Sequence, residues 1–430
     1  MRLASSLRRF FEWKYFLPAC LALAFMLRLA WVLVAHTEPV NDWKWYFDRA
    51  TALAYGEGYV FRGELTAYWP VGWPAVLAAV FSVTGPSIFA GQMTNVILYL
   101  GIITVCYYLG RELFRSRLTG AIAALLLAVY PNHIAYCAML CSETQYTFLT
   151  LLGILLTVLS RNRAWMLLLA GAILGLAILT REQGYFVPLI AGLLLPARGE
   201  SISLRCRLRA ALMVILAAVA AVLPWTIRNY TVFGRIVPVS TNLGINLWTG
   251  NNPYQTGSYC LDPRMLSDIE REDSPTGECE WDDACKRHAI RYVISHPLRT
   301  LRFAVIKGVK TYRWDWDGIC WGTPDSRPAR IMKTLCKGYY AVVMAVFGVG
   351  LVAYAWSRKR MGTMRLPTIG LWLTAYWLAG NLIAYGYPRY HYAAMPWVII
   401  YVAAFVSSSF PSSKIKQDEA LLLPPTRAEG

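Results

Sequence analysis

The sequence predicts an all-α polytopic membrane protein with about ten transmembrane helices and a small α/β region outside the membrane. The first observation is composition: 57% of the 430 residues are hydrophobic and only 16% are charged, whereas soluble domains carry about 25% charged residues. The second is the recurrence of apolar stretches close to the length of a membrane span. The third is that lysine and arginine gather in every second gap between those stretches.

A membrane-spanning helix needs about 20 predominantly apolar residues. The first stretch follows a basic N-terminus, but no small-residue cleavage site follows at "LVAHTEP", so we interpret it as a retained span. We expect the spans at 16–35, 87–110, 118–131, 144–160, 164–180, 184–196, 209–227, 338–356, 366–385 and 391–410.

The basic residues orient these spans. Short cytoplasmic gaps are enriched in lysine and arginine, so both termini are expected in the cytoplasm. The net charge of +17 then reflects topology rather than a nucleic-acid-binding domain. The residues concerned are Arg2, Arg8, Arg9, Lys14, Arg111, Arg115, Arg117, Arg161, Arg163, Arg198, Arg205, Arg207, Arg209, Arg358, Lys359, Arg360 and Arg365.

This topology divides the chain into four parts. Residues 1–228 form an N-terminal transmembrane module with a first outer loop at 36–70, and residues 229–337 form an extracytoplasmic soluble segment. That long segment is basic, but long loops cross the membrane largely regardless of charge. Residues 338–410 form C-terminal transmembrane helices, and the polar, proline-containing tail 411–430 is expected to be a disordered cytoplasmic segment.

The first outer loop carries a helical pattern. Asn41 is a candidate N-cap, and Asp42 lies in the first turn, where a carboxylate suits the helix dipole. Apolar residues recur at helical spacing and could lie in the lipid interface: Trp43, Tyr46, Phe47, Ala50 and Leu53. In the long outer segment, an alternating stretch before residue 262 and an acidic helical stretch near 262–296 predict a small α/β cap.

Several kinds of site lack support in the sequence. There is no Walker A or GxGxxG phosphate cradle and no Cys/His spacing typical of zinc. Cysteines in the outer segment could form disulfides in an oxidising compartment, but their connectivity is open: Cys260, Cys279, Cys285, Cys320 and Cys336.

A set of charged residues falls at the outer ends of the predicted spans. Ionisable groups near spans are costly and mark functional sites. Arginines beside carboxylates and aromatic rings suit a lipid-linked phosphate with a polar substituent. The set is Asp42, Asp48, Glu143, Arg181, Glu182, Arg228 and Arg389, with His391 beside the last.

At these positions the sequence resembles the integral-membrane glycosyltransferases of the C superfamily (GT-C), in particular the bacterial branch related to protein O-mannosyltransferases and the lipid A aminoarabinose transferase. One part of the resemblance is the spacing of Asp42, Tyr46, Ala50, Leu53, Gly56, Gly58 and Tyr59. The rest comprises "YWPVGWP", "CSE", "LTREQGYFVP", "RNYTVFG", "NLGINLWTGNNP" and "PRYHYAAMP".

The resemblance implies a GT-C-like fold and an inverting transfer of a sugar from a polyprenyl-phosphate donor at the outer membrane face. Asp42 matches the catalytic base of the first outer loop, and Arg181, Arg228 and Arg389 would meet the phosphate. The implied substrate-binding set is Tyr46, Asp48, Tyr68, Glu143, Arg181, Arg228, Arg389, Tyr390 and His391.

Two positions depart from the family pattern. Related enzymes often carry two adjacent acids where this chain has Asn41 and Asp42, which removes any argument from paired carboxylates. Some carry a lysine beside the proline turn where this chain has Tyr68 and Trp69, which leaves the identity of the phosphate-binding cation open.

The residues also have purely structural interpretations. Asp42 could serve only the helix dipole, Glu143 could be a solvated cap of the fourth span, and His391 could be a hydrogen-bonded interface residue. Arg28, inside the first span, could snorkel or pair with a carboxylate. A divalent metal is left open, because one Asp and one Glu could hold an ion only if they approach each other.

Two other functions fit a polytopic chain with outer-face charges. One is a polymerase or ligase of polyprenyl-linked glycan with a diphosphate donor, and the other is a lipid-linked sugar transporter (flippase), although transporters tend to show repeated halves. The expected partners are the donor, an acceptor that is a lipid, glycan or protein, and membrane lipid. The expected location is the bacterial inner membrane, with the site facing the periplasm.

Overall fold

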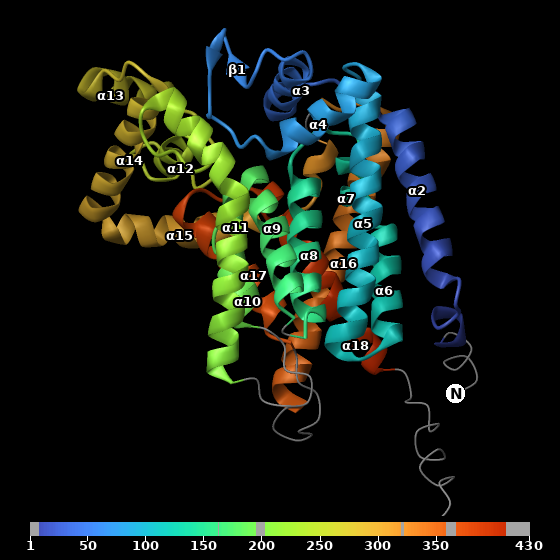
Figure 1. Cartoon of the computed structure of the whole chain (residues 1–430). Helices are drawn as coiled ribbons and strands as arrows, with labels where there is room; N and C mark the ends of the chain where they lie inside the picture. Colours follow the sequence, from blue (N-terminus) through green and yellow to red (C-terminus); the bar gives the residue numbers. More distant parts are fainter. Residues whose placement is uncertain (1–7, 162, 195–202, 320–321, 358–366, 410–430) are drawn as a thin grey trace, which may run out of the picture.

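The chain forms a bundle of helices with a helical lobe beside one end (Figure 1). The computed structural model describes residues 8–161, 163–194, 203–319, 322–357 and 367–409. The only strands in this described part are β1 (Val60–Phe61) and β2 (Glu64–Leu65), which form one short antiparallel hairpin in the first outer loop. The predicted all-α fold class is therefore confirmed.

The bundle is that of a multi-pass membrane protein. In the described part of the chain, five segments are long and apolar enough to cross a membrane: α2 (Phe16–Ala35), α5 (Ile88–Phe114), α11 (Leu204–Phe233), α16 (Arg327–Ser357), and η3 (Pro388–Ala394) with α18 (Met395–Ser408). Shorter apolar helices accompany them: α4 (Gly72–Thr84), α6 (Arg117–Ala128), α8 (Glu143–Leu159), α9 (Ala164–Thr180) and α17 (Ile369–Ile383).

Two segments differ from the sequence prediction. The stretch after the proline turn of "YWPVGWP", which is not among the expected spans, forms helix α4, because residues 75–84 contain no charged residue, proline or glycine. The span predicted at 184–196 consists instead of a 3-10 turn, η1 (Glu182–Gly184), and the short helix α10 (Val187–Leu193). Residues 195–202 lie outside the described part.

The orientation of the helices agrees with the distribution of basic residues. Helix α2 begins and α18 ends at the same end of the bundle (Figure 1). Arg111 and Arg115 of the α5–α6 connection, Arg161 before α9 and Arg205 in α11 also belong to that end. The basic group 358–365 and the tail 411–430, predicted to be disordered, lie outside the described residues.

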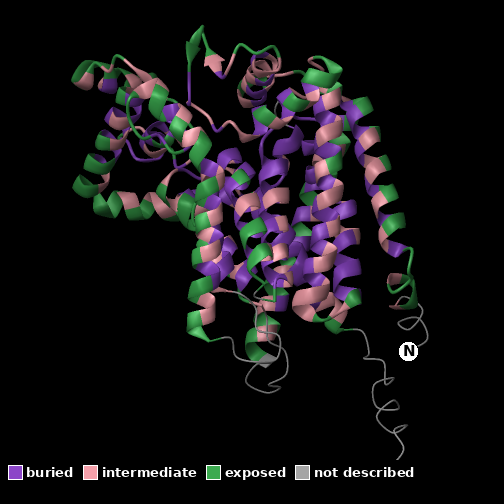
Figure 2. Cartoon of the chain, in the orientation of Figure 1, coloured by how far each residue is buried: buried purple, intermediate pink, exposed green. Residues whose placement is uncertain are grey.

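The centre of the bundle is formed by α18 and the short helix α7 (Pro131–Tyr136). Residues 395–404 of α18 and all residues of α7 are buried, whereas α11 and α16 expose long apolar faces (Figure 2). Arg28 of α2 is fully buried and donates to the carbonyl oxygens of Leu127 and Ala128 at 3.1 and 2.9 Å. It therefore satisfies the carbonyl end of α6, a structural role in which carbonyl oxygens take the place of the expected carboxylate.

The outer segment, 229–337, was expected to form a small α/β cap, and this prediction is wrong in its β part. Its described residues contain no strand, and four α-helices lie wholly within it: α12 (Leu243–Gly250), α13 (Pro263–Asp273), α14 (Glu278–Ser295) and α15 (Pro297–Thr311). The acidic helical stretch is present as α13 and α14. The preceding β-branched stretch lies along the first outer loop, where Thr241 N donates to Ala67 O at 3.0 Å, but no ladder of such bonds makes it a strand.

The helix of the first outer loop, α3 (Asn41–Ala54), also differs from its prediction. Val40 precedes its first residue, no side chain caps it, and Asn41 itself has a positive φ of 49°. The face bearing Trp43, Tyr46 and Ala50 is buried and packs on α4. The apolar face of α3 therefore faces protein rather than lipid.

The loop and the lobe are joined by one carboxylate. Glu278, in the first turn of α14, accepts hydrogen bonds from Thr66 Oγ1 (2.6 Å), Ala67 N (2.9 Å) and Thr241 Oγ1 (2.5 Å). Arg228 at the outer end of α11 donates to Thr66 O at 2.9 Å and to Tyr59 O at 3.3 Å. These contacts fix residues 59–67 between the lobe and the bundle.

Helices α9 and α11 approach closely because of the GxxxG pair. A Cβ at Gly171 would collide with the carbonyl oxygen of Val214, and one at Gly175 would lie 2.6 Å from that of Ala218. Small residues permit such contacts between helices in membranes.

We predict that Gly171→Leu separates α9 from α11 and destabilises the protein by about 1–3 kcal/mol, the usual cost of overpacking. Thermal unfolding in detergent, followed by tryptophan fluorescence, measures the effect. The matched control is Gly348→Leu in α16, where an added Cβ meets nothing within 4 Å. Equal losses in the two variants would contradict the prediction.

Candidate active site

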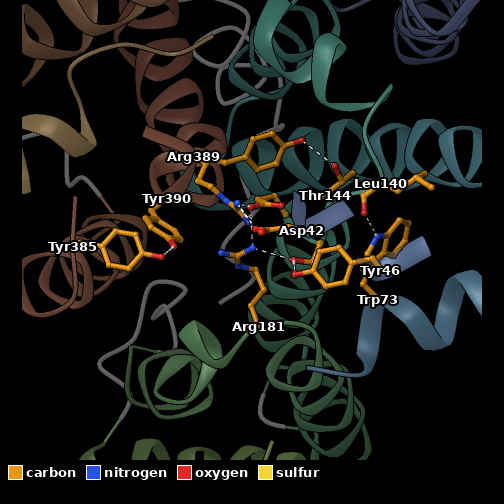
Figure 3. A network of polar contacts seen from close by, with 12 residues as sticks. Asp42, Tyr46, Trp73, Leu140, Thr144, Arg181, Tyr385, Arg389 and Tyr390 are labelled. Carbon is orange, nitrogen blue, oxygen red and sulfur yellow. Dashed lines mark hydrogen bonds and ion pairs between the residues drawn. The ribbon is translucent and has the colours of Figure 1, made fainter. Parts of the chain in front are cut away.

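Four charged side chains meet at the outer end of the bundle. Arg389 lies between two carboxylates: its Nη1 is 2.5 Å from Asp42 Oδ2, and its Nε is 2.8 Å from Glu143 Oε1. Arg181 Nη1 lies 2.9 Å from the same Glu143 oxygen. Figure 3 shows Asp42, Arg181 and Arg389 converging from separate segments of the chain.

Each member comes from a different segment. Asp42 is in the first turn of α3, Glu143 opens α8, Arg181 directly follows α9, and Arg389 lies in η3 before the buried helix α18. All four positions are at the ends of these elements. The site therefore exists only when the first outer loop and three parts of the bundle are folded together.

The N-terminus of α8 is held in place by contacts around it. Trp73 Nε1 donates to Leu140 O at 2.7 Å, and the hydroxyls of Thr144 and Tyr392 lie 3.2 Å apart. These bonds fix the turn that carries Ser142 and Glu143, so the carboxylate is presented to both arginines by a rigid support.

Burial strengthens the electrostatics of this cluster. Glu143 is 3% exposed and Arg389 8% exposed, whereas the side chain of Asp42 is 24% exposed. Buried charges are tolerated only when paired, and here two guanidinium groups offset two carboxylates. Asp42 is the member of the cluster that solvent or substrate reaches most readily.

One oxygen of Glu143 is not used by the cluster. Oε2 is buried and has no hydrogen-bond partner among the described residues. An unsatisfied buried acceptor costs free energy, so this oxygen suits a hydroxyl donor from a bound molecule.

Hydroxyl and aromatic groups line the remaining sides. Ser142 Oγ lies 3.0 Å from Arg181 Nη1 and 3.3 Å from the Tyr46 hydroxyl. The ring of Tyr390 lies 5.7 Å from the Arg181 guanidinium carbon, and its hydroxyl is 2.5 Å from that of Tyr385. Aromatic rings with a few precisely placed polar groups are typical of sites that bind small molecules.

Of the residues chosen from the sequence, the structure brings Asp42, Tyr46, Glu143, Arg181, Arg389 and Tyr390 together. Four others have different surroundings. Asp48 pairs with Lys44 at 2.8 Å on the exposed side of α3. Arg228 holds the backbone of the first loop, and Tyr68 packs against Trp45 and Trp69.

His391, the fourth of these residues, belongs to a second buried cluster. Its Nδ1 faces Thr311 O at 2.6 Å, and its Nε2 lies 3.1 Å from Asp315 Oδ1. Asp315 also accepts from Tyr130 OH at 2.5 Å and from Asn132. Burial disfavours its charged form, but His391 outweighs burial and holds the pKa of the Asp315 carboxyl below its usual value. This cluster joins the outer segment to α7 and η3.

Three residues of the site were not predicted from the sequence: Ser142, Tyr385 and Asn246. Ser142 precedes Glu143 within the quoted "CSE" and could have been included with it. Tyr385 lies four residues before Arg389, in the same outer turn. Asn246, which accepts from Tyr385 OH at 3.3 Å, comes from α12 of the lobe, and no local pattern marks it.

The carboxylates do not form a metal site in their present arrangement. Within the described residues, no group of three or more His, Cys, Asp or Glu side chains is placed to hold a metal ion. Asp42 and Glu143 are instead bridged by a cation, Arg389. The donor set therefore does not fit a resident divalent ion.

Comparison with known proteins gives the class of the fold. Residues 69–225 match the model of the family described as dolichyl-phosphate-mannose-protein mannosyltransferase. This segment includes Glu143 and Arg181 but neither Asp42 nor Arg389. No curated protein sequence matches the chain significantly.

Solved structures extend the likeness to the whole chain. The archaeal oligosaccharyltransferase AglB from Archaeoglobus fulgidus, in complex with an inhibitory peptide and a dolichol-phosphate, is 15% identical with a TM-score of 0.56, and the match covers 95% of this chain and 52% of AglB. The apo form of the Archaeoglobus fulgidus oligosaccharyltransferase gives 14% identity, a TM-score of 0.57 and the same coverage. This chain thus spans about half the length of that protein.

A further match has a lower structural score. ArnT from Cupriavidus metallidurans, bound to undecaprenyl phosphate, is 12% identical with a TM-score of 0.42 over 96% of this chain and 80% of ArnT. The fold is GT-C-like, as the matches to the Archaeoglobus fulgidus oligosaccharyltransferase show. The resemblance of this chain to the GT-C superfamily, inferred from its outer-face motifs, is confirmed by the family match and the shared fold.

One carboxylate beside the site is poorly satisfied. Asp317, in the 3-10 turn η2 (Asp317–Ile319), is 4% exposed, and its Oδ2 has no hydrogen-bond partner among the described residues. Burial raises the pKa of its carboxyl from 3.8 to about 7. Between these values the folded chain binds more protons than the unfolded chain, so stability falls as the pH rises from about 4 to about 7.

We predict that Asp317→Asn stabilises the protein at pH 8 by about 1 kcal/mol or more, and that the gain shrinks toward about pH 4. The reason is that the amide carries no charge to bury. Unfolding midpoints of both proteins across this pH range measure the effect. Asp325→Asn, at a side chain that is 85% exposed, is the control and should show no such trend. A gain at Asp317 that does not depend on pH would contradict the assigned cause.

Proposed function

We propose that this protein is a membrane glycosyltransferase that moves a sugar from a polyprenyl-phosphate donor to an acceptor hydroxyl, with inversion at the anomeric carbon and Asp42 as general base. The observation that carries the proposal is the Asp42–Arg389–Glu143–Arg181 cluster at the outer end of a GT-C fold. The proposed location is the bacterial inner membrane, with the site facing the periplasm.

In the proposed step, Asp42 takes the proton of the acceptor hydroxyl as the acceptor oxygen bonds to the anomeric carbon. The bond from that carbon to the phosphate oxygen breaks, and its electron pair stays on the lipid phosphate. General base catalysis requires the carboxylate to be within hydrogen-bond reach of the acceptor proton. The partial exposure of Asp42 is compatible with such an approach.

The charge balance of the cluster supports this sequence of events. Before transfer, two arginines and two carboxylates sum to zero. When Asp42 accepts a proton, the cluster gains one positive charge just as the departing phosphate gains one negative charge. Arg389 then loses its anionic contact with Asp42 and becomes available to the phosphate. Such preorganised groups aimed at developing charge supply much of enzymatic catalysis.

Besides Arg389, Arg181 is the second arginine that we propose binds the phosphate. It contacts Glu143 and Ser142 and lies against the Tyr390 ring, so its remaining donors can reach a phosphate. Arg228 instead donates to the loop backbone, so we assign it to positioning the first loop. The unpartnered Glu143 Oε2 is proposed to accept a hydrogen bond from a hydroxyl of the sugar.

The proposed acceptor is a hydroxyl of a protein, a lipid or a glycan. A flippase finds less support, because the buried ion pairs of Asp42, Glu143, Arg181 and Arg389 are gathered at the outer end of the bundle. The diphosphate-donor polymerase or ligase would need more positive charge than the balanced cluster provides.

We predict that Asp42→Asn lowers transfer by about 10²–10⁴-fold, the range of general base catalysis. The assay is in vitro transfer from a lipid-phosphate sugar by the full chain in lipid. Asp48→Asn is the matched control, because Asp48 is on the same helix but pairs with exposed Lys44. Full activity of the Asp42 variant would exclude Asp42 as the general base.

We further predict that Arg181→Ala weakens binding of polyprenyl phosphate by about 10- to 100-fold, because one charge-assisted contact is lost. Titration with the sugar-free lipid phosphate measures this directly. Arg235→Ala, which removes an exposed partner of Asp283 in the lobe, serves as control. Unchanged affinity in the Arg181 variant would exclude this residue from the phosphate site.

A further inference from the structure

Helix α15 exposes an apolar stripe that no described part of the chain covers. Four residues of this stripe are more than half exposed: Leu298 (82%), Leu301 (65%), Val305 (64%) and Val309 (63%). Their spacing of three, four and four residues places them on one face of the helix. Figure 2 shows α15 as a mostly exposed helix at the edge of the lobe.

The opposite face of α15 is firmly attached to the protein. Lys307 is fully buried and donates to Asn251 Oδ1 at 3.1 Å and to Ile383 O at 3.3 Å. On one flank of the stripe, Gly308 packs on α17, with Leu382 3.1 Å from where its Cβ would lie. The exposed stripe is therefore a fixed feature of the fold, because the helix cannot roll without breaking these contacts.

The position of α15 relates the stripe to the membrane. The helix runs roughly perpendicular to the upright helices, forms the lower edge of the lobe and lies below the outer end of α11 (Figure 1). Its contact with Leu382 is at the outer end of α17, beside Ile383, which is itself 62% exposed. The stripe thus continues the lipid-facing surface of a membrane-crossing helix at the level where that helix ends.

The charges of α15 suit one side of a membrane interface. From 297 to 313 the chain has no acidic residue but contains Arg299, Arg302, Lys307, Lys310 and Arg313. Arg299 and Lys310 lie on the flank beside the lobe and donate to Pro253 O and Thr256 O, at 2.8 and 2.7 Å. Arg302 is exposed beside the stripe, where its stem can lie along acyl chains and its guanidinium can reach a phosphate.

We propose that α15 is an interfacial helix whose stripe, Leu298, Leu301, Val305 and Val309, is inserted at the headgroup–acyl boundary of the outer leaflet, with Arg302 contacting anionic phospholipid. A basic amphipathic helix with a fixed apolar face is bound in this way by buried apolar area and by attraction to anionic lipid. The helix would thereby hold the lobe at a set height over the bundle. This inference stands on the membrane fold alone and does not depend on the proposed transfer reaction.

The experiment places a photoreactive p-benzoylphenylalanine at single positions of the full chain in nanodiscs of phosphatidylcholine and phosphatidylglycerol. Val305 is the test position, Leu216 on the exposed face of α11 is the lipid-facing reference, and Ser267 on the exposed side of α13 is the reference away from the membrane. After irradiation, peptide mass spectrometry identifies the adducts.

We expect phospholipid adducts at 305 in yields comparable to those at 216, and none at 267. Adducts at 216 without adducts at 305, or a protein adduct at 305, would overturn the proposal. The charge contact has its own test: Arg302→Gln should lower the ratio of phosphatidylglycerol to phosphatidylcholine adducts at 305 by about fivefold. An unchanged ratio would exclude recognition of anionic lipid by this residue.

Discussion

The structure of the candidate site depends on Arg389 and its two carboxylates. Its guanidinium joins Asp42 of the first outer loop to Glu143 of α8, two residues that are about a hundred positions apart in the chain and that would repel each other without it. A buried carboxylate without a cation is strongly unfavourable. The loop can therefore dock on the bundle in this position only because η3 delivers a cation between the two acids.

The same arrangement explains why the site lies where helices end. Glu143, Arg181 and Arg389 are each at or beside the end of a helical segment, and α18, which follows Arg389, is buried along most of its length. A rigid buried helix behind Arg389 and a hydrogen-bonded turn before Glu143 reduce the freedom of both groups. Preorganisation of this kind lets charge be met without rearrangement when it develops.

Much of this could be predicted from the sequence, because hydrophobic length and the positions of arginine depend on local composition. These features predicted most of the helices, and they predicted that Asp42, Glu143, Arg181 and Arg389 lie on one side of the membrane. Other features depend on packing that leaves no local pattern. The face of α3 looked suited to lipid but is buried on α4, whereas α15 exposes a comparable face. Arg228 resembles the other outer-face arginines in sequence, yet its partners are backbone oxygens.

Glu278 has a mechanical consequence for the whole outer surface. Because its carboxylate binds Thr66, Ala67 and Thr241 at once, the lobe and the loop that carries Asp42 share one rigid joint. Tilting of the lobe would pull on residues 66–67, which lie between α3 and α4, and would be transmitted to the end of α3. The position of the lobe and the position of Asp42 are thus coupled through residues 66 and 67.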